Sequence, residues 1–366
     1  MILPGLGDVH RWASPRPGDG SSFMRKIVID RPGSYDRLII REGLALQPTE
    51  DGVVVAVEAI GVNYADCMVR MGLYQSAKDF VGWPITPGFE VTGRVARVGA
   101  AVTDLAVGDA VLAVTLFGGY ATEVAVRRPY VFRLPPGTDP VAMAGFPAVF
   151  MTAYFALFEL AHPRPGAQLL VHSAAGGVGG ALVQLGRLAG CEVTGVVGAT
   201  HKLETLADLG VDHAIDKSTA PLWARAEAIA PDGFDVVCDA NGVATLAQSY
   251  AHLRRAGKLV VYGFHTMIPR RGGKPNWLKL AVDYFRTPRF NPLQMTTESR
   301  SVLAFNLSYL FDRLDILDEA MTRLMGWLEA GQITPAPVER FPLEAVADAH
   351  RRIESGQSVG KLVLLP

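Results

Sequence analysis

A glycine-rich turn places the strongest constraint on how this chain can fold. It spans residues 173–179 (SAAGGVG) and lies between an apolar stretch typical of a strand and a segment with helical periodicity, 178–189. Such a turn leaves the amides at the helix N-terminus available to a dinucleotide pyrophosphate. Gly176 would let the backbone approach the pyrophosphate, and Gly179 would allow close packing of helix on strand. Ala174 stands where the usual first glycine of the pattern falls.

The glycine turn belongs to a regular alternation of strands and helices. Nearly continuous apolar stretches predict strands at 168–173, 192–197, 213–215, 234–238 and 258–262. Apolar strands that alternate with helices are typical of a parallel sheet covered by helices on both faces. The sequence therefore predicts an α/β, doubly wound domain over residues 148–312, with an irregular insertion at 265–300 that is rich in Arg, Pro, Lys and Asn.

The part of the chain before residue 148 has a different pattern. Short strand-like segments, broken by Gly and Pro, recur at 53–60, 93–98, 110–115 and 120–126. They predict a β-rich domain. An amphipathic helix at 314–330 and a strand at 361–365 are interpreted as a return to this domain, which would then comprise residues 24–147 and 313–366.

Charge and cysteine usage exclude several classes of protein. With 35 Lys and Arg against 36 Asp and Glu, the chain lacks the overall positive field that attracts nucleic acid. Cys67, Cys191 and Cys238 are too few for a disulfide framework and are expected to be buried thiols in a reducing compartment. No stretch approaches the ~20 apolar residues of a membrane span, so we expect a cytoplasmic protein. Residues 1–23 lack the apolar block of a signal peptide and are interpreted as a disordered leader or as residues foreign to the native chain.

The end of the second strand bears on the choice between NAD and NADP. An acid that binds the adenosine ribose of NAD is expected about 20 residues after the glycine turn, but residues 198–202 (GATHK) contain none. A ribose 2′-phosphate could instead find donors in Thr200, Lys202 and Lys217. Hydrogen bonds to charged groups contribute about 1.5 to 3 kcal/mol each, enough for about one to two decades of discrimination. This pattern favours NADPH, although either lysine could be a solvated surface charge.

Four motifs together carry a resemblance to a known family. They are GVNYAD at 61–66, RMGLY at 70–74, PGFEVTG at 87–93 and AAGGVG at 174–179. In this combination they resemble the quinone-reductase-like medium-chain dehydrogenases/reductases, over about residues 24–366. Within that superfamily, the insertion and two tail segments are similar to the synaptic-vesicle amine-transport protein homologues. The tail segments are FNLSYL at 305–310 and VGKLV at 359–363.

The resemblance implies a GroES-like catalytic domain beside a Rossmann domain, with NADPH in the cleft and a homodimer as the assembly. Zinc-dependent relatives carry His in a Gly-His-Glu motif, where this chain has Phe89 between Gly88 and Glu90. Asn63 lies in the region where those relatives begin their cysteine ligand. With eight scattered histidines and no clustered cysteines, we expect no zinc site. Hydride transfer would then depend on positioning and on protein hydrogen-bond donors.

Three residues are expected at the reacting end of the site. Adding hydride to the β-carbon of an α,β-unsaturated carbonyl builds negative charge on the carbonyl oxygen, which an O–H or amide donor stabilises. The resemblance implies that Tyr74 supplies this donor, that Asn63 faces the nicotinamide ribose, and that Tyr64 lines the pocket. Tyr74 could instead be a packing residue with a satisfied hydroxyl. Asp66 is interpreted as an acceptor for backbone amides rather than as a base.

The other cofactor residues also follow from the resemblance. It places Thr152 near the nicotinamide amide and Lys361 near the phosphates. The family often has Tyr where Lys217 stands, so charge pairing would replace stacking at that position. The pyrophosphate would be held by Gly176, Gly177, Val178 and Gly179. The cofactor edge and nicotinamide pocket would be formed by Asn241, Gly242, Tyr262, Gly263, Phe305, Asn306 and Leu307.

Three functions are weighed against one another. The leading hypothesis is a zinc-independent, NADPH-dependent oxidoreductase that transfers hydride to a small-molecule electrophile, either a quinone or an enone or enoyl thioester. The alternative is an NADPH-binding scaffold or membrane-surface protein with weak or vestigial catalysis, because residues 265–300 mix cations with aromatic side chains. That segment could also be a dimer edge or a loop that lines the pocket. The ligand inventory disfavours a zinc alcohol dehydrogenase.

Overall fold

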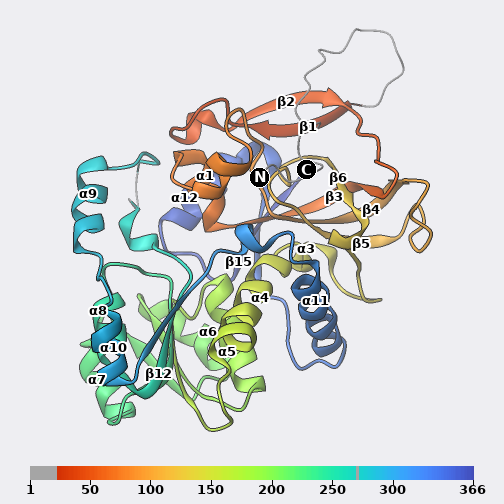
Figure 1. Ribbon diagram of the computed structural model, residues 1–366. Helices are drawn as coiled ribbons and strands as arrows, with labels where there is room; N and C mark the ends of the chain where they lie inside the picture. Colours follow the sequence, from red (N-terminus) through yellow and green to blue (C-terminus); the bar gives the residue numbers. More distant parts are fainter. Residues whose placement is uncertain (1–22, 269–271) are drawn as a thin grey trace.

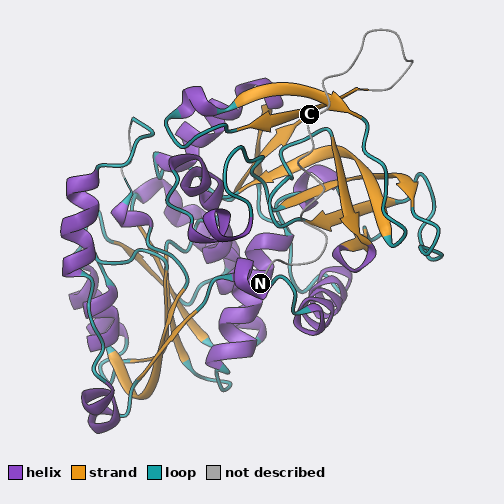
Figure 2. Cartoon of the chain, turned by 45° about the horizontal axis from the view of Figure 1, so that its top comes forward, coloured by secondary structure: helices purple, strands orange, loops and turns teal. Residues whose placement is uncertain are grey.

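The computed structural model describes residues 23–268 and 272–366, which form two bodies built on separate sheets (Figure 1). The predicted leader lies outside the described residues, except that Phe23 opens the first strand. Figure 2 shows the two groups of strands on different sides of the molecule, with helices around and between them. The predicted α/β class, with a β-rich part and a parallel-sheet part, is confirmed.

The β-rich body is a seven-stranded, largely antiparallel sheet. Its strands are β3 (Gly52–Val62), β4 (Glu90–Val98), β5 (Ala110–Val114), β6 (Glu123–Arg127), β7 (Val131–Arg133), β14 (Val338–Pro342) and β15 (Lys361–Leu365). The order is β14-β15-β3-β4-β5-β7, and β6 also pairs with β3. The end of the chain thus completes a sheet that begins at residue 52. A separate antiparallel pair is formed by β1 (Phe23–Val28) and β2 (Ile39–Leu44).

The second body is built on a six-stranded parallel sheet. Its strands are β8 (Gln168–His172), β9 (Glu192–Val197), β10 (His213–Asp216), β11 (Phe234–Asp239), β12 (Leu253–Val261) and β13 (Ser301–Ala304). The order is β10-β9-β8-β11-β12-β13, and each pairing is parallel. The direction of winding reverses between β8 and β11. In doubly wound sheets, ligands bind outside the carboxyl ends of the strands at this reversal.

Helices join the two bodies over a common interior. Buried side chains of α4 (Pro147–Tyr154), α5 (Gly177–Leu188) and α11 (Leu314–Glu329) share one apolar core with Leu112 and Tyr130 of the β-rich body. The helix α4 continues into a π-helical segment, Phe155–Ala161. The helices around the sheets are α1 (Tyr64–Met71), α2 (Gln75–Phe80), α3 (Pro140–Met143), α4 (Pro147–Tyr154), α5 (Gly177–Leu188), α6 (Leu203–Leu209), α7 (Leu222–Ile229), α8 (Leu246–Ala251), α11 (Leu314–Glu329) and α12 (Val346–Glu354).

The segment 265–300, predicted to be irregular, contains two regular helices, which corrects the sequence interpretation. They are α9 (Trp277–Arg286) and α10 (Pro292–Glu298). The asparagines that suggested a loop cap these helices, since Asn276 Oδ1 accepts from Lys279 N and Asn291 Oδ1 from Leu293 N, each at 3.0 Å. Within residues 23–268 and 272–366, no helix has the length and apolar character needed to cross a membrane.

Candidate active site

The turn after β8 has the shape that a phosphate cradle requires. Ser173 begins it with a φ of +55°, and Gly176 caps α5 in an extended conformation. A Cβ on Gly179 would lie 2.2 Å from Ser173 O, so glycine is needed for this close approach of helix and strand. Gly177, Val178 and Gly179 are the first residues of α5, and their amides lack acceptors within the helix. These amides are available to a pyrophosphate.

Asn241 lies beside Ser173 at the point where the strand order reverses. It follows β11, and its Oδ1 accepts from Ser173 Oγ at 3.3 Å. Its Nδ2 is buried and has no hydrogen-bond partner among the described residues. A buried amide donor without an acceptor is costly, and an oxygen of a bound pyrophosphate or ribose would supply one. The residues at this edge therefore fit a dinucleotide.

Asp239, which the sequence analysis missed, holds this loop in place. Its fully buried carboxylate ends β11 and accepts from Asn241 N, Thr245 Oγ1 and Ser249 Oγ, each at 2.7 Å. Gly242 has a φ of +87°, a conformation that favours glycine. The available signal was an acid at the end of an apolar strand, directly before a loop that contains Asn-Gly.

The residues expected to bind a ribose 2′-phosphate are in part committed elsewhere. Lys202 Nζ donates to Gly356 O at 2.7 Å and to Ser358 O at 2.8 Å, so it binds a loop of the β-rich body instead. Thr200 Oγ1 donates to Asp216 Oδ2 at 2.6 Å. These contacts differ from the roles that the sequence suggested for Thr200 and Lys202.

Asp216 is a second acid that the sequence analysis missed, because an acid is expected at the end of the second strand, whereas Asp216 ends the third. It ends β10 and pairs with Val197 at the end of β9. Hydrogen bonds from Ser218 and then Thr200 lower the pKa of its carboxyl, so it is ionised at neutral pH. Lys217 follows it, and a Cβ on Gly198 would lie 3.5 Å from Lys217 Cε. An acid and a lysine, adjacent in the sequence, thus follow the third strand beside the end of the second, where the adenosine ribose is expected.

At the reacting end, Asn63 belongs to a buried charged cluster. The Lys361 ammonium lies 2.8 Å from Glu90 Oε1 and 2.7 Å from Asn63 Oδ1. Asn63 Nδ2 donates to Glu90 Oε1 at 2.8 Å, and Glu90 Oε2 accepts from Ala148 N at 2.7 Å. The stem of Lys361 lies against the glycine turn, since a Cβ on Gly177 would lie 2.9 Å from Lys361 Cδ. The ammonium group of Lys361, which the resemblance placed near the phosphates, binds Glu90 and Asn63 instead.

Asp66 anchors the start of α1 beside this cluster. Its carboxylate accepts from Asn63 N at 2.7 Å, Gly88 N at 2.9 Å and Tyr120 Oη at 3.0 Å. Burial raises the pKa of Asp66 to about 7, and the hydrogen bonds act in the opposite direction. Asp66 is the acceptor for backbone amides that the sequence suggested.

Tyr74 connects the two bodies at the reacting end. Its hydroxyl lies 3.0 Å from Asn306 Oδ1 and 2.9 Å from Ser308 Oγ. Its ring packs edge-on against Phe89 and Phe117. Burial raises the pKa of Tyr74, so the hydroxyl keeps its proton at neutral pH. The residue therefore combines a packed ring with a donor aimed at the segment after β13.

The expected nicotinamide residues lie along one edge of the parallel sheet. Tyr262 and Gly263 follow β12, while Phe305, Asn306 and Leu307 follow β13. Because all strands of this sheet run in the same direction, these ends share the edge that carries the glycine turn and the loop after β11. The fold thus brings together five residues that are scattered in the sequence.

Tyr64 and Thr152 approach this edge from α1 and α4. Tyr64 Oη donates to His265 O at 3.3 Å, just beyond β12. Thr152 Oγ1 donates to Ala148 O at 2.7 Å, so its hydroxyl is used within its own helix. Tyr64 therefore spans the two bodies, whereas Thr152 makes a local contact.

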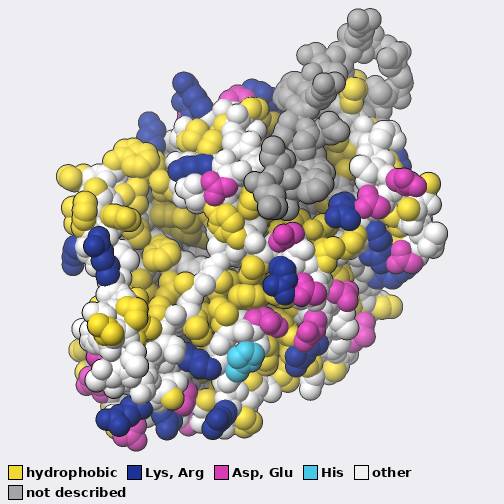
Figure 3. Space-filling view, viewed as in Figure 1, with side chains coloured by type: hydrophobic (Ala, Val, Ile, Leu, Met, Phe, Trp, Pro, Cys, Tyr) yellow, Lys and Arg dark blue, Asp and Glu magenta, His cyan; other side chains and the backbone are white. Residues whose placement is uncertain are grey.

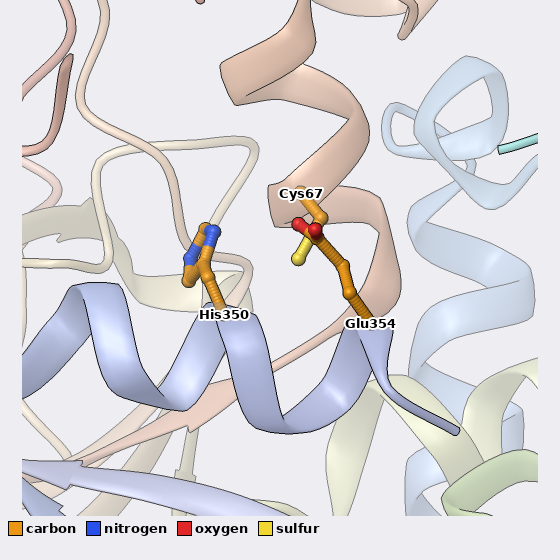
Figure 4. Close-up of side chains that lie close together, drawn as sticks. All are labelled: Cys67, His350 and Glu354. Carbon is orange, nitrogen blue, oxygen red and sulfur yellow. The ribbon is translucent and has the colours of Figure 1, made fainter. Parts of the chain in front are cut away.

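A second polar cluster, between α1 and α12, does not suit a metal ion. Figure 4 shows Cys67 with His350 and Glu354, whose possible ligand atoms lie within 4.8 Å of one another. The buried guanidinium of Arg70 donates to Glu354 Oε1 at 2.7 Å and lies 3.0 Å from His350 Nδ1. A metal would have to displace this cation, which leads us to interpret the cluster as a structural ion pair. The three cysteines, Cys67, Cys191 and Cys238, are free and buried, as predicted.

The similarity of this chain to known proteins identifies its family. Residues 209–364 match the family described as zinc-binding dehydrogenase, and residues 49–136 match the alcohol dehydrogenase GroES-like domain. The synaptic vesicle membrane protein VAT-1 homolog of Rattus norvegicus is 34% identical over 346 residues, covering 94% of this chain and 84% of the relative. The chain belongs to the medium-chain dehydrogenase/reductase superfamily.

Solved structures of medium-chain dehydrogenases/reductases share the fold over most of the chain. Escherichia coli quinone oxidoreductase complexed with NADPH is similar with a TM-score of 0.81 and 25% identity, covering 93% of this chain and 100% of that chain. CurK enoyl reductase gives the same TM-score, 0.81, with 25% identity, and covers 93% of this chain and 99% of that chain. The chain is thus similar throughout to oxidoreductases of this superfamily.

The residues of this medium-chain dehydrogenase/reductase do not fit the zinc named in its family's description. Asn63 and Phe89 stand where the resemblance places the cysteine and histidine ligands of zinc-dependent relatives. The Lys361 ammonium already lies within 2.8 Å of Asn63 and Glu90. A fixed positive charge at this place opposes a metal cation and occupies the acceptor oxygens that would bind it.

Proposed function

We propose that the protein is a zinc-independent, NADPH-dependent reductase of quinones or α,β-unsaturated carbonyls. The hydrogen bond between Tyr74 and Asn306 carries this proposal, because it puts a phenol donor at the sheet edge where the cofactor residues gather. The similarity to a quinone oxidoreductase complexed with NADPH and to an enoyl reductase supports it. NADPH would supply the hydride.

The side chains and backbone amides of this protein would bind the cofactor, orient its nicotinamide and stabilise the charge that forms on the substrate. The amides of the glycine turn and Asn241 Nδ2 would bind the pyrophosphate. Asn63, fixed on both sides of its amide by Glu90 and Lys361, would orient the nicotinamide ribose. These contacts position the reacting carbons, which lowers the entropic part of the barrier.

Tyr74 would stabilise the charge that hydride transfer creates. When hydride adds to the β-carbon of an enone, the C=C electron pair forms the double bond between the α-carbon and the carbonyl carbon, and the C=O pair moves onto the oxygen. The Tyr74 O–H donates to the oxygen of this enolate. Ser308 N continues to satisfy Asn306 Oδ1 at 3.0 Å while Tyr74 turns toward the substrate. A proton from water then completes the saturated carbonyl.

The test is a panel of quinones, enones and enoyl thioesters with NADPH and with NADH, followed by the loss of reduced-nicotinamide absorbance. We expect turnover with at least one class and a preference for NADPH. Cofactor binding is measured separately by fluorescence of the nicotinamide. Absence of turnover across the panel, with NADPH bound, would overturn the proposed activity.

A second candidate function is an NADPH-binding protein of membrane surfaces with weak or vestigial catalysis. The exposed apolar side chains of α9 favour it, and relatives named synaptic vesicle membrane proteins support it. The same panel separates the two candidates, since this one predicts tight NADPH binding with little or no turnover.

A further inference from the structure

Three polar groups meet where the chain after β13 reaches Tyr74. Tyr74 Oη donates to Asn306 Oδ1 at 3.0 Å, and Asn306 Oδ1 also accepts from Ser308 N at 3.0 Å. Ser308 Oγ lies 2.9 Å from Tyr74 Oη, and Ser308 is buried. A carbonyl oxygen can only accept, and a phenol has a single proton to give. Tyr74 gives that proton to Asn306, so the hydrogen bond between the two hydroxyls takes its proton from Ser308.

The amide of Asn306 has the orientation that this assignment needs. Because its Oδ1 accepts from the backbone N–H of Ser308, the amide oxygen and not the nitrogen lies beside the Tyr74 hydroxyl. If Tyr74 donated to Ser308 instead, two oxygens with no proton between them would lie 3.0 Å apart. The order of donation is therefore from Ser308 to Tyr74 and from Tyr74 to Asn306.

The segment that carries Ser308 is held against the β-rich body at a second point. Tyr309 Oη donates to Asp79 Oδ2 at 2.6 Å, and its ring centroid lies 5.4 Å from that of Phe80. Asp79 and Phe80 end α2, the helix that Tyr74 precedes. The chain around Ser308 thus contacts both ends of α2, which fixes the Ser308 hydroxyl beside that of Tyr74.

Apolar groups surround this chain of hydrogen bonds. The ring of Tyr74 packs edge-on against Phe89 and Phe117. Figure 3 shows hydrophobic side chains gathered along the middle of one face of the molecule, where the two bodies meet. In apolar surroundings successive hydrogen bonds strengthen one another, because each donor polarises the group that it binds. The proton that Ser308 donates therefore makes the Tyr74 O–H a stronger donor.

We propose that Ser308 is a positioning residue for Tyr74, which holds the phenol oxygen in place while the phenol proton turns from Asn306 to the substrate. The inference rests on the proposed reduction, in which Tyr74 donates to the oxygen of the enolate. When the proton turns, Asn306 Oδ1 keeps the N–H of Ser308, and the phenol oxygen keeps the hydroxyl proton of Ser308. Neither oxygen is left without a donor, so the turn costs little free energy.

Ser308→Ala removes the hydroxyl and leaves the backbone N–H on Asn306. We expect kcat for the best substrate of the panel to fall about tenfold, a smaller loss than in Tyr74→Phe, with the dissociation constant for NADPH nearly unchanged. Ser308→Thr keeps a hydroxyl and should retain kcat to within about threefold of the wild type. Thermal unfolding establishes that each variant folds.

A double-mutant cycle separates this role from a structural one. The Tyr74→Phe protein has no phenol for Ser308 to support, so adding Ser308→Ala to it should change kcat by less than about twofold. Equal losses from Ser308→Ala in the wild type and in Tyr74→Phe would show that Ser308 acts independently of Tyr74, and the proposal would be wrong.

Tyr309→Phe is the matched control, because it removes the neighbouring hydroxyl of the same segment. Tyr309 is 44% exposed, its hydrogen bond to Asp79 lies at the surface, and its ring can stay against Phe80. Its kcat should lie within about twofold of the wild type. A loss as large as that in Ser308→Ala would mean that docking of the segment matters rather than the Ser308 hydroxyl, which contradicts the proposal.

The phenol of Tyr74 also reports on Ser308 without any turnover. Burial raises the pKa of Tyr74, and the hydrogen bond from Ser308 acts in the opposite direction. The titratable groups that face this phenol, Asp66 and Tyr309, remain in the variant. Ser308→Ala should therefore raise the pKa of Tyr74 further. NMR of the tyrosine Cζ resonances follows the titration, and the Tyr74 resonance is identified by its absence from Tyr74→Phe.

Failure of this inference and failure of the proposed function give different results. If Tyr74→Phe lowers kcat and Ser308→Ala does not, the reductase stands and the role of Ser308 is excluded. If no compound of the panel turns over, the proposed function fails, and the Tyr74 titration decides the inference. An unchanged pKa of Tyr74 in Ser308→Ala would then overturn it, whereas a raised pKa would establish Ser308 as the donor to the phenol.

Discussion

The hydroxyl of Tyr74 lies 3.0 Å from Asn306 Oδ1, although the two residues are 232 positions apart in the sequence. Tyr74 precedes α2 in the β-rich body, and Asn306 follows β13 in the parallel-sheet body. A single phenol thus reaches from one body to the cofactor edge of the other. This contact allows a chemical role for Tyr74 to be separated from its packing role, because Phe keeps the ring and removes only the donor.

Tyr74→Phe should lower kcat for an enone by about a hundredfold, the usual loss when one donor to a developing oxyanion is removed. The dissociation constant for NADPH should stay nearly unchanged, because the hydroxyl is not expected to bind the cofactor. Steady-state kinetics at saturating NADPH and a separate fluorescence titration measure the two effects. Tyr130→Phe, which removes a hydroxyl that donates to Phe311 O at 3.1 Å, is the control. Equal kcat values in the two variants would remove Tyr74 from the mechanism.

Gly179→Ala and Gly180→Ala should differ sharply, although the two glycines are neighbours. The new Cβ at residue 179 would lie 2.2 Å from Ser173 O, so the turn must move. We expect a loss of about 1 to 3 kcal/mol in unfolding free energy and weaker NADPH binding. At residue 180 the nearest contact would be 3.5 Å, to Leu209 Cδ1, and Ala raises helix propensity by about 1 kcal/mol. Urea unfolding and NADPH titration compare the two variants. Similar losses of stability and of NADPH affinity in both variants would contradict the proposed cradle.

The features that sequence reasoning reached are local ones. Apolar strands, the glycine turn and the alternation with helices can each be seen within a short window, because a parallel sheet buried on both faces needs continuous apolar strands. The partners of Lys361 could not be found in this way. Glu90 is 271 positions away, and no local pattern pairs the two. The family resemblance placed Lys361 near the phosphates, whereas the structure puts only its stem beside the glycine turn and its ammonium group on Glu90 and Asn63.

The orientation of α9 shows a second limit of sequence reasoning. Helical periodicity indicates that a helix has two unlike faces, but the assumption that the apolar face turns inward fails here. Asp283 and Lys279 attach α9 to the protein through polar contacts instead. Asp216 shows a different limit, since the pattern expects the acid at the end of the second strand, whereas a parallel neighbour brings the end of the third strand to the same place.

Lys217 and Asp216 should set the preference between NADPH and NADH in opposite directions. Lys217→Gln should weaken NADPH binding about tenfold and leave NADH binding almost unchanged, because NADH lacks the 2′-phosphate. Asp216→Asn should strengthen NADPH binding, since it removes a negative charge beside Thr200. Nicotinamide fluorescence gives both dissociation constants. Lys202→Gln is the control, because that ammonium binds backbone carbonyls and should not affect the preference. Parallel losses for both cofactors in Lys217→Gln would exclude a phosphate contact.

His350 should make the protein less stable in mild acid. It is buried between Arg70 and Tyr120, and this burial, together with the charge of Arg70, lowers its pKa well below 6.5. In the unfolded chain a histidine takes up a proton near pH 6.5, whereas His350 in the folded chain stays neutral. Its contribution to stability is therefore complete above that pH and is lost as the pH falls. The loss is about 1 kcal/mol of unfolding free energy over the first pH unit below.

His350→Gln isolates this effect, because a glutamine Oε1 can still accept from Arg70. Urea unfolding of both proteins at neutral and mildly acidic pH should show the wild type losing about 1 kcal/mol more than the variant. Asp66 acts in the opposite sense, since a carboxyl whose pKa is raised to about 7 stabilises the fold below that pH, but it is present in both proteins. His201→Gln, at an exposed histidine, controls for the loss of an imidazole. Identical pH profiles for the wild type and His350→Gln would show that His350 is protonated in the folded protein.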